Sequence, residues 1–248
     1  MSLESIALLG LPGSGKSRIE QALLESQASQ TADNIILAQN VKVVEVSGQI
    51  IQGKQADQSF DLVLCILDVR STLLAGRDDW LEVQLKEMLA ASHAVIYNFL
   101  EASSLDEQSW WGRWIKINAP ELSVFRVLNG VLPDSLFSLF SSFEQGGYPP
   151  KKLPQQAWQN FEFEVGCISL DHLLFGLDSS KQNLGMKIAR VTGVVETLEY
   201  DNLVTLEGSA LRWDMFAAKQ SAASGVITIQ GQALDQAWLE ELIKASLV

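Results

Sequence analysis

The sequence predicts an α/β unit with a mostly parallel sheet over residues 1–145 and a smaller α+β unit with an antiparallel sheet over residues 160–248. In the first part, short apolar runs alternate with segments whose apolar residues recur at helical spacing, as in parallel strands joined by helices. In the second part, apolar and polar residues alternate along several stretches, which favours antiparallel strands. The segment between them is rich in Gly, Pro and Lys, and we therefore predict a linker over residues 146–159.

The elements of the first unit follow from apolar runs and helical periodicity. Its strands are predicted at residues 6–9, 35–38, 41–46, 62–67, 94–99 and 124–128. One helix is expected to begin at Lys16, because Ile19 and Leu23 then share a face. Another is expected after Asp78 and Asp79, since carboxylates suit the amino terminus of a helix and Leu81 and Leu85 follow at helical spacing. The last two helices are predicted at residues 105–117 and 134–143.

The second unit combines strands with two helices. The segment from Phe161 to Val165 alternates aromatic or apolar with acidic residues, which is typical of a half-buried strand. Further strands are predicted at residues 187–198, 203–213 and 226–229. A short helix is expected at residues 171–177 and an amphipathic one at residues 233–247. This mixture predicts an α+β module with an antiparallel sheet.

Composition and charge exclude several classes of protein. Of 248 residues, 47% are hydrophobic and 19% are charged, which is enough apolar surface for a sizeable core. A net charge of −12 without a basic run argues against a nucleic-acid partner. Two Cys and two His cannot form a four-ligand zinc site without carboxylates, and a disulfide scaffold is not expected. No apolar run reaches about 18 residues and no signal peptide is recognised, so we expect no membrane contact and a cytoplasmic location.

The segment from Gly10 to Ser17 fits the phosphate-loop pattern G-x-x-x-x-G-K-[ST]. Glycines let successive backbone N–H groups turn towards a polyphosphate, the lysine neutralises phosphate charge, and the last hydroxyl can bind Mg²⁺. A chance match has odds of about one in a hundred, and the position between a predicted strand and helix favours a true nucleotide site over an incidental glycine turn. The predicted nucleotide-binding residues here are Gly10, Gly13, Ser14, Gly15, Lys16 and Ser17.

Around this loop, the chain resembles the CobW-type GTPases, which are relatives of the UreG and HypB metallocentre-assembly GTPases. The segment 43–48, Val-Val-Glu-Val-Ser-Gly, is similar to the family's switch strand, and 64–69, Leu-Cys-Ile-Leu-Asp-Val, resembles its Val-Asp-Ala strand. Residues 94–101 fall where the family has its guanine-reading Asn-Lys-x-Asp. In the second unit, Arg-Val-Thr-Gly-Val at 190–194 is similar to the family's Arg-x-Lys-Gly strand.

The resemblance implies a P-loop NTPase domain that binds GTP, or ATP, together with Mg²⁺. It implies that Lys16 and Glu45 are catalytic, and that Ser17 binds Mg²⁺ directly while Glu45 does so through a water molecule. The Gly48 N–H would contact the γ-phosphate and sense the nucleotide state. From the residues alone, Glu45 is equally a solvent-facing carboxylate at a strand end, and Gly48 is equally an ordinary turn glycine.

Two departures from the family pattern concern metal and base recognition. The family's Cys-x-Cys-Cys metal motif has no counterpart, so the soft ligands for zinc or cobalt are absent. In the guanine motif, Phe99 replaces the lysine and Glu101 the aspartate, while Asn98 is retained. The resemblance still implies that Asn98 and Glu101 contact the base, but the choice between GTP and ATP stays open.

Other side chains have both functional and structural interpretations. Asp68 ends a predicted strand and either supports the Mg²⁺ shell or caps the following loop. Arg70 and Arg77 are more readily interpreted as solvated than as groups that stabilise transition-state charge. In the tryptophan-rich helix 105–117 we favour core packing over a docking surface. Cys65 is expected to be an inert core thiol.

Taken with the resemblance, the leading hypothesis is Mg²⁺-dependent GTP hydrolysis that gates an interaction with an unknown protein partner or a metal cargo. The alternative is a nucleotide-binding or protein-interaction module that keeps the fold without turnover. A small-molecule kinase ranks last, because no arginine-rich insertion follows the loop. The sequence does not decide the oligomeric state, and a homodimer is one possibility.

Overall fold

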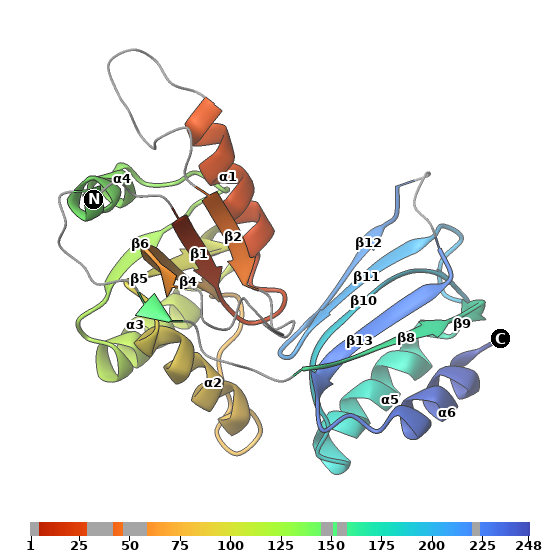
Figure 1. The fold of residues 1–248 in the computed structure, drawn as a ribbon. Coiled ribbons are helices and arrows are strands. Elements are labelled where there is room, and N and C mark those ends of the chain that lie inside the picture. The colour runs from red at the N-terminus through yellow and green to blue at the C-terminus, as the bar shows by residue number, and fades with distance from the viewer. Residues whose placement is uncertain (1–4, 29–41, 47–58, 145–150, 153–157, 220–223) are drawn as a thin grey trace. The chain divides into compact units, whose positions relative to one another are not determined.

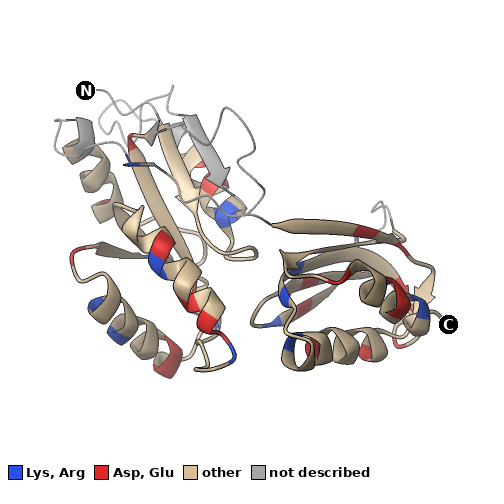
Figure 2. Cartoon of the chain, turned by 60° about the horizontal axis from the view of Figure 1, so that its bottom comes forward, with Lys and Arg blue, Asp and Glu red and all other residues tan. Residues whose placement is uncertain are grey.

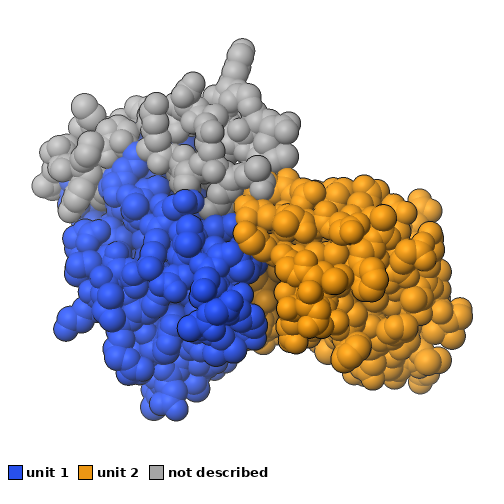
Figure 3. Space-filling view, turned by 90° about the horizontal axis from the view of Figure 1, so that it is seen from below, with its two compact units in different colours: residues 1–156 blue, residues 157–248 orange. Residues whose placement is uncertain are grey.

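The computed structural model describes residues 5–28, 42–46, 59–144, 151–152, 158–219 and 224–248 (Figure 1). The chain divides into two compact units, residues 1–156 and residues 157–248 (Figure 3). The first is α/β with a parallel sheet and the second is α+β with a largely antiparallel sheet, so the predicted fold class is confirmed.

The first unit is built on a five-stranded parallel sheet with the order β2-β1-β4-β5-β6 (Figure 1). Its strands are β1 (Ser5–Leu9), β2 (Lys42–Val46), β4 (Leu62–Asp68), β5 (Ala94–Asn98) and β6 (Ser123–Arg126). Nearly every residue of β1, β4 and β5 is buried, because helices cover both faces of the sheet. The strand predicted at residues 35–38 lies outside the described residues.

Within the described ranges, α1 and α4 pack on one face of this sheet and α2 and α3 on the other (Figure 1). The helices are α1 (Lys16–Ala28), α2 (Asp79–Ala90), α3 (Leu105–Asn118) and α4 (Asp134–Glu144), with a short 3-10 turn at Leu100–Ala102. Ile19 and Leu23 of α1 and Phe140 of α4 share one core cluster with residues of β1, β4 and β5. None of the helices in the described ranges is long and apolar enough to cross a membrane.

Part of the predicted linker forms a short strand instead. β7 (Lys151–Lys152) pairs antiparallel with β3 (Ser59–Phe60). The Lys151 ammonium donates to Ala90 O at 3.2 Å and Ser92 O at 2.6 Å, beside the carboxyl end of α2, where a cation complements the helix dipole. Because the partners lie about 60 residues away in the sequence, the local Pro-rich composition gives no sign of this strand.

The second unit places two helices on one face of a sheet (Figure 1). The strand order is β12-β11-β10-β13-β8 with antiparallel pairs, and β9 joins β10 in parallel. The strands are β8 (Gln159–Glu164), β9 (Cys167–Ile168), β10 (Lys187–Thr197), β11 (Val204–Ser209), β12 (Trp213–Ala217) and β13 (Val226–Gln232). The helices are α5 (Leu170–Asn183) and α6 (Gln236–Ser246). Figure 2 shows Lys and Arg interspersed with Asp and Glu along the described elements of both units.

The single strand predicted at residues 203–213 is wrong, because the chain reverses within it and forms the hairpin of β11 and β12. The Ser209 hydroxyl accepts hydrogen bonds from Leu211 N at 3.3 Å and from Arg212 N at 3.1 Å. The Ser209 N–H also donates to Arg212 O at 2.8 Å. A serine hydroxyl that bonds nearby backbone N–H groups competes with extended structure and favours a turn.

The helix predicted at residues 171–177 extends to Asn183 and continues through Gly176. A Cβ atom on Gly176 would overlap Leu242 Cδ1 of α6. The glycine, which lies inside the predicted helix, therefore permits a close approach of the two helices. The added residues after 177 also contact α6, because the hydroxyl of the buried Ser180 accepts from Trp238 Nε1 at 2.9 Å.

Glu199 caps the amino terminus of α5, and its loss is expected to destabilise the second unit. Its carboxylate accepts from Leu170 N at 3.0 Å, from Asp171 N at 3.2 Å and from Ser169 Oγ at 3.1 Å. Burial alone would raise the pKa of Glu199, but these hydrogen bonds together lower it. Glu199→Gln should lower the free energy of unfolding by about 1 kcal/mol at pH 7.

Because the folded-state pKa of Glu199 is depressed, this contribution is present above the unfolded pKa and is lost as the pH falls through the folded value. The difference between wild type and Glu199→Gln should therefore be full at pH 7 and shrink in urea titrations as the pH falls below the ordinary glutamate pKa of about 4.3. Glu241→Gln, which removes an exposed ion pair with Lys244 on α6, serves as control and should change stability little. An equal deficit at pH 7 and pH 3 would contradict the capping role.

Candidate functional site

The phosphate-loop segment lies at the point where the sheet order reverses. β2, the next parallel strand along the chain, pairs with one edge of β1. The later strands β4, β5 and β6 are added on the opposite side of β1. In open parallel sheets of this kind, ligands bind outside the carboxyl ends of the strands at such a switch point. The loop joins the carboxyl end of β1 directly to the first turn of α1, whose positive dipole end faces the same place.

Three glycines give this loop its backbone path. Gly13 and Gly15 have φ values of 82° and 81°, which residues with a Cβ adopt rarely. A Cβ on Gly10 would lie 2.6 Å from Ile66 O of β4 and 2.6 Å from Ser14 Oγ. The loop therefore passes too close to its neighbours for larger residues, and it leaves its N–H groups near the helix start.

Lys16 is buried inside the loop, with 4% of its surface exposed. Its ammonium donates to Gly10 O at 3.1 Å and to Leu11 O at 3.0 Å. These contacts hold a positive charge at the centre of the loop, beside the helix amino terminus. Such an arrangement attracts a phosphate group.

Two serines of the loop segment differ in their environment. Ser14 is 3% exposed, and its hydroxyl has no hydrogen-bond partner within the part of the chain that the structure describes. A buried hydroxyl without a partner costs free energy, which a ligand oxygen would recover. Ser17 is exposed in the first turn of α1. Among the described residues no group of three or more His, Cys, Asp or Glu could hold a metal ion.

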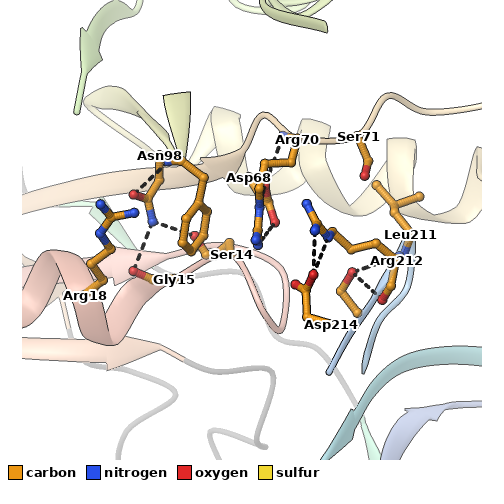
Figure 4. Close-up of polar contacts among 12 residues, drawn as sticks. Ser14, Gly15, Arg18, Asp68, Arg70, Ser71, Asn98, Leu211, Arg212 and Asp214 are labelled. Carbon is orange, nitrogen blue, oxygen red and sulfur yellow. Dashed lines mark hydrogen bonds and ion pairs between the residues drawn. The ribbon is translucent and has the colours of Figure 1, made fainter. Parts of the chain in front are cut away.

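Asn98 fastens the carboxyl end of β5 to the loop (Figure 4). The side chain is fully buried, and its Nδ2 donates to Ser14 O at 3.1 Å and to Gly15 O at 3.3 Å. Its Oδ1 accepts from Phe99 N at 3.0 Å. Most of the hydrogen-bonding capacity of Asn98 thus holds the loop in place, and its contact with a base stays a prediction.

Phe99 places its ring against the loop and between two arginines. Its backbone is left-handed, with φ 62° and ψ 33°, and a Cβ on Gly15 would lie 2.7 Å from the ring. Arg18 Cζ lies 5.0 Å and Arg70 Cζ 3.8 Å from the ring centroid. These are cation–π distances, so two positive charges lie beside the Phe99 ring.

Glu101 connects α1 with the loop that follows β6. Its Oε1 accepts from Arg18 Nη1 at 2.7 Å and its Oε2 from Asn129 N at 3.1 Å. Burial alone would raise the pKa of Glu101, but hydrogen bonds from its own backbone, from Arg18 and from Asn129, together with the Arg18 charge, lower it. Glu101 is therefore a carboxylate near neutral pH.

The loop after β4 is closed by an ion pair (Figure 4). Asp68 accepts from Arg70 Nε at 2.9 Å, from Arg70 Nη2 at 2.6 Å and from Arg70 N at 3.0 Å. Of the two interpretations of Asp68, the structure thus supports the loop cap. Arg77 forms a similar pair with the buried carboxylate of Asp78, at 2.8 and 2.7 Å, which fixes the loop before α2.

The functional groups of the two predicted switch residues lie outside the described part of the chain. Glu45 lies on β2 opposite Leu8, but its side chain is outside the described residues, and so is Gly48. Conversely, Arg18 is not among the residues predicted from the sequence, yet it meets both Phe99 and Glu101. Its position two residues after Lys16, in the first turn of the loop helix, is a signal that could have identified it.

Two further groups have structural roles. Trp111 and Trp114 of α3 are buried, and the Trp111 Nε1–H donates to Ser71 O at 2.9 Å, in agreement with core packing. Trp110 is half-buried and stacks on Trp114. Cys65 is fully buried in β4, and burial raises its pKa to about 12, so its thiol stays protonated and inert.

Comparisons with known proteins give distant similarities. No protein-family model and no curated protein matches the chain. Among solved structures, the Zn(II)-bound YjiA GTPase from E. coli is 12% identical over 100% of both chains, with a TM-score of 0.35. The apo translation elongation factor SelB from Methanococcus maripaludis is 14% identical over 92% of this chain and 55% of its own, with a TM-score of 0.39. At this level of similarity, the functions of these proteins do not transfer to the chain.

Proposed function

We propose that residues 1–145 form a nucleotide-binding domain that binds GTP with Mg²⁺ and hydrolyses it slowly. The observation that carries this proposal is the buried Lys16 ammonium inside a glycine-bounded loop at the sheet's switch point. Both features suit a polyphosphate, because the loop offers backbone N–H groups and the lysine offers a charge. Guanine as the base follows from the resemblance of residues 94–101 to the Asn-Lys-x-Asp motif.

In this proposal each loop residue has a defined role. The loop N–H groups and the Ser14 hydroxyl bind phosphate oxygens, and Lys16 balances the charge of the β and γ phosphates. Ser17 holds Mg²⁺, which when bound supplies further neutralisation of the same oxygens. Glu45 positions the attacking water or a metal-bound one, and the Gly48 N–H responds to the γ-phosphate. Catalysis then depends on position and charge rather than on a covalent intermediate.

The nucleotide state would gate an interaction with a partner. A protein partner suits this chain better than a soft-metal cargo. The only thiols are Cys65, which is buried and inert, and Cys167, which is half-buried on β9. Zinc or cobalt transfer needs accessible thiolate or imidazole ligands in a group, and within the described ranges no such group is present.

The second candidate is a nucleotide-binding module without turnover. The observation that favours it is Asp68, whose two carboxylate oxygens are held by the Arg70 guanidinium at the end of β4. A carboxylate in that pair is less available to support the Mg²⁺ shell. In this case the protein would respond to nucleotide binding and release rather than to hydrolysis.

A phosphate-release assay separates the two candidates. Purified protein with Mg²⁺ and either GTP or ATP should release phosphate, and Ser17→Ala should reduce the rate at least about tenfold, because the hydroxyl ligand for Mg²⁺ is lost. Ser141→Ala, which removes an exposed hydroxyl on α4, is the matched control and should leave the rate unchanged. Nucleotide binding without any Ser17-dependent release would favour the second candidate, and no binding would contradict both.

A further inference from the structure

The base end of the proposed nucleotide site contains a cation that the predicted motif does not include. Phe99 stands where the motif would have a lysine, so the segment 98–101 itself carries no positive charge. Arg18, from the first turn of α1, brings its guanidinium to within 5.0 Å of the Phe99 ring centroid. The same group lies beside Gly130, where a Cβ would be 3.3 Å from Arg18 Nε. Arg18 therefore contacts segments that follow two different strands, β5 and β6.

Arg18 and Glu101 form a donor–acceptor pair on this surface. The Arg18 Nη1 and Glu101 Oε1 atoms are 2.7 Å apart, and the two side chains are 29% and 27% exposed. The guanidinium has five N–H groups, and among the described contacts it donates hydrogen bonds only through Nη1. The second carboxylate oxygen is fixed by Asn129 N. The pair is thus held in place and still faces solvent with unused donors and acceptor lone pairs.

The base chemistry that matches this pair is guanine. Guanine presents two acceptors, O6 and N7, next to two donor groups, the N1–H and the 2-amino group. A guanidinium binds O6 and N7 in a bidentate manner, and a carboxylate accepts from N1–H and the 2-amino group. Adenine has an amino group in place of O6 and no N1–H, so it offers the arginine one acceptor fewer and the carboxylate no matching pair of donors.

We propose that Arg18, paired with Glu101, is the specificity-determining residue that selects guanine over adenine in this chain. Phe99 occupies the lysine position of the base motif, and Arg18 of α1 supplies a cation beside it. The Phe99 ring holds the guanidinium by a cation–π contact. This inference rests on the proposed nucleotide site but makes a separate claim about base selection.

Four nucleotides test this claim by calorimetry in the presence of Mg²⁺: GTP, ATP, 7-deaza-GTP and ITP. Compared with GTP, 7-deaza-GTP lacks the N7 acceptor and ITP lacks the 2-amino group. The wild-type chain should bind GTP at least about tenfold more tightly than ATP, and it should bind 7-deaza-GTP and ITP several-fold more weakly than GTP. In Arg18→Ala, the discrimination against 7-deaza-GTP should disappear and that against ATP should fall to about threefold or less.

Two further variants separate base reading from folding and from charge. Arg18→Lys keeps the positive charge without the planar fork, so it should retain most of the affinity for GTP and still lose the discrimination against 7-deaza-GTP. Lys86→Ala removes a comparable exposed ion pair with Glu82 on α2 and should behave as wild type. Because the Arg18–Glu101 pair is partly exposed, its loss should change the melting temperature little.

The outcomes are distinct. If wild type and Arg18→Ala discriminate equally against 7-deaza-GTP, or if wild type binds GTP and ATP equally, the inference is overturned while the proposed function stands. If the wild-type chain binds none of the four nucleotides, the proposed function fails and the inference fails with it.

Discussion

Lys16→Ala is expected to lower the affinity for Mg²⁺-bound nucleotide about a hundredfold or more. The substitution removes the charge held inside the loop by Gly10 O and Leu11 O, at 3.1 and 3.0 Å. Two charge-assisted hydrogen bonds to phosphate account for a loss of this size. The effect on the fold should be small, within about 1 kcal/mol, because a buried ammonium is itself costly to desolvate. Calorimetry with GTP and ATP measures the binding, and thermal unfolding of the full chain measures the stability.

The matched control for this prediction is Lys151→Ala. Lys151 is also a lysine whose ammonium donates to two backbone carbonyls, Ala90 O and Ser92 O, but it lies beside the end of α2 and not in the loop. Its removal should reduce stability slightly and leave nucleotide affinity unchanged. Unaltered affinity in Lys16→Ala would contradict the phosphate-binding role of the loop, whereas equal losses in both variants would indicate a general effect on folding.

Asn98→Asp is expected to destabilise the first unit by about 3 kcal/mol, although the change replaces one amide by a carboxylate of the same shape. The Nδ2 donor to Ser14 O and Gly15 O becomes a charged oxygen that faces two carbonyl oxygens at a fully buried position. A buried charge without a partner is among the most costly changes in a protein interior. The phosphate loop should lose its position at the same time, so nucleotide affinity should fall at least about tenfold.

Asn98→Ala is the informative companion variant. It also removes the donor but introduces no charge, so its loss should be smaller, about 2 kcal/mol. The carboxyl group that Asn98→Asp introduces at this buried position would have a raised pKa and could donate once protonated. The deficit of Asn98→Asp relative to Asn98→Ala should therefore shrink as the pH falls from about 8 to about 5. Urea titrations at both pH values measure this. An aspartate variant as stable as wild type at the higher pH would contradict the proposed fastening of the loop.

The sequence predicts those parts of this fold that depend on local patterns. The apolar runs of β1, β4 and β5 and the glycine–lysine loop between β1 and α1 are local, and the structure contains all of them. The short strand β7 depends on Phe60 and on the end of α2, and the part of α5 after residue 177 packs on Trp238 of α6 through Ser180. Contacts between residues so distant along the chain leave no periodic signal.

In the candidate site, too, features that are local in the sequence are predictable and contacts between distant residues are not. The loop residues are recognisable because their spacing is fixed within eight residues. Arg18 meets Phe99 and Glu101 only after α1 and β5 come together, so no motif spans them. The turn at Ser209 is an intermediate case, since its hydroxyl acts within three residues but the surrounding apolar pattern still suggests one continuous strand.

The side-chain connections between the strand ends have a consequence for the thermodynamics of binding. Asn98 joins the segment after β5 to the loop after β1, Phe99 and Arg70 join it to the loop after β4, and Glu101 joins it to Asn129 after β6. These four segments are ordered against one another before any ligand arrives. A ligand that binds here does not have to restrict them, so little conformational entropy is lost in these segments and more of the gross interaction energy is retained as affinity.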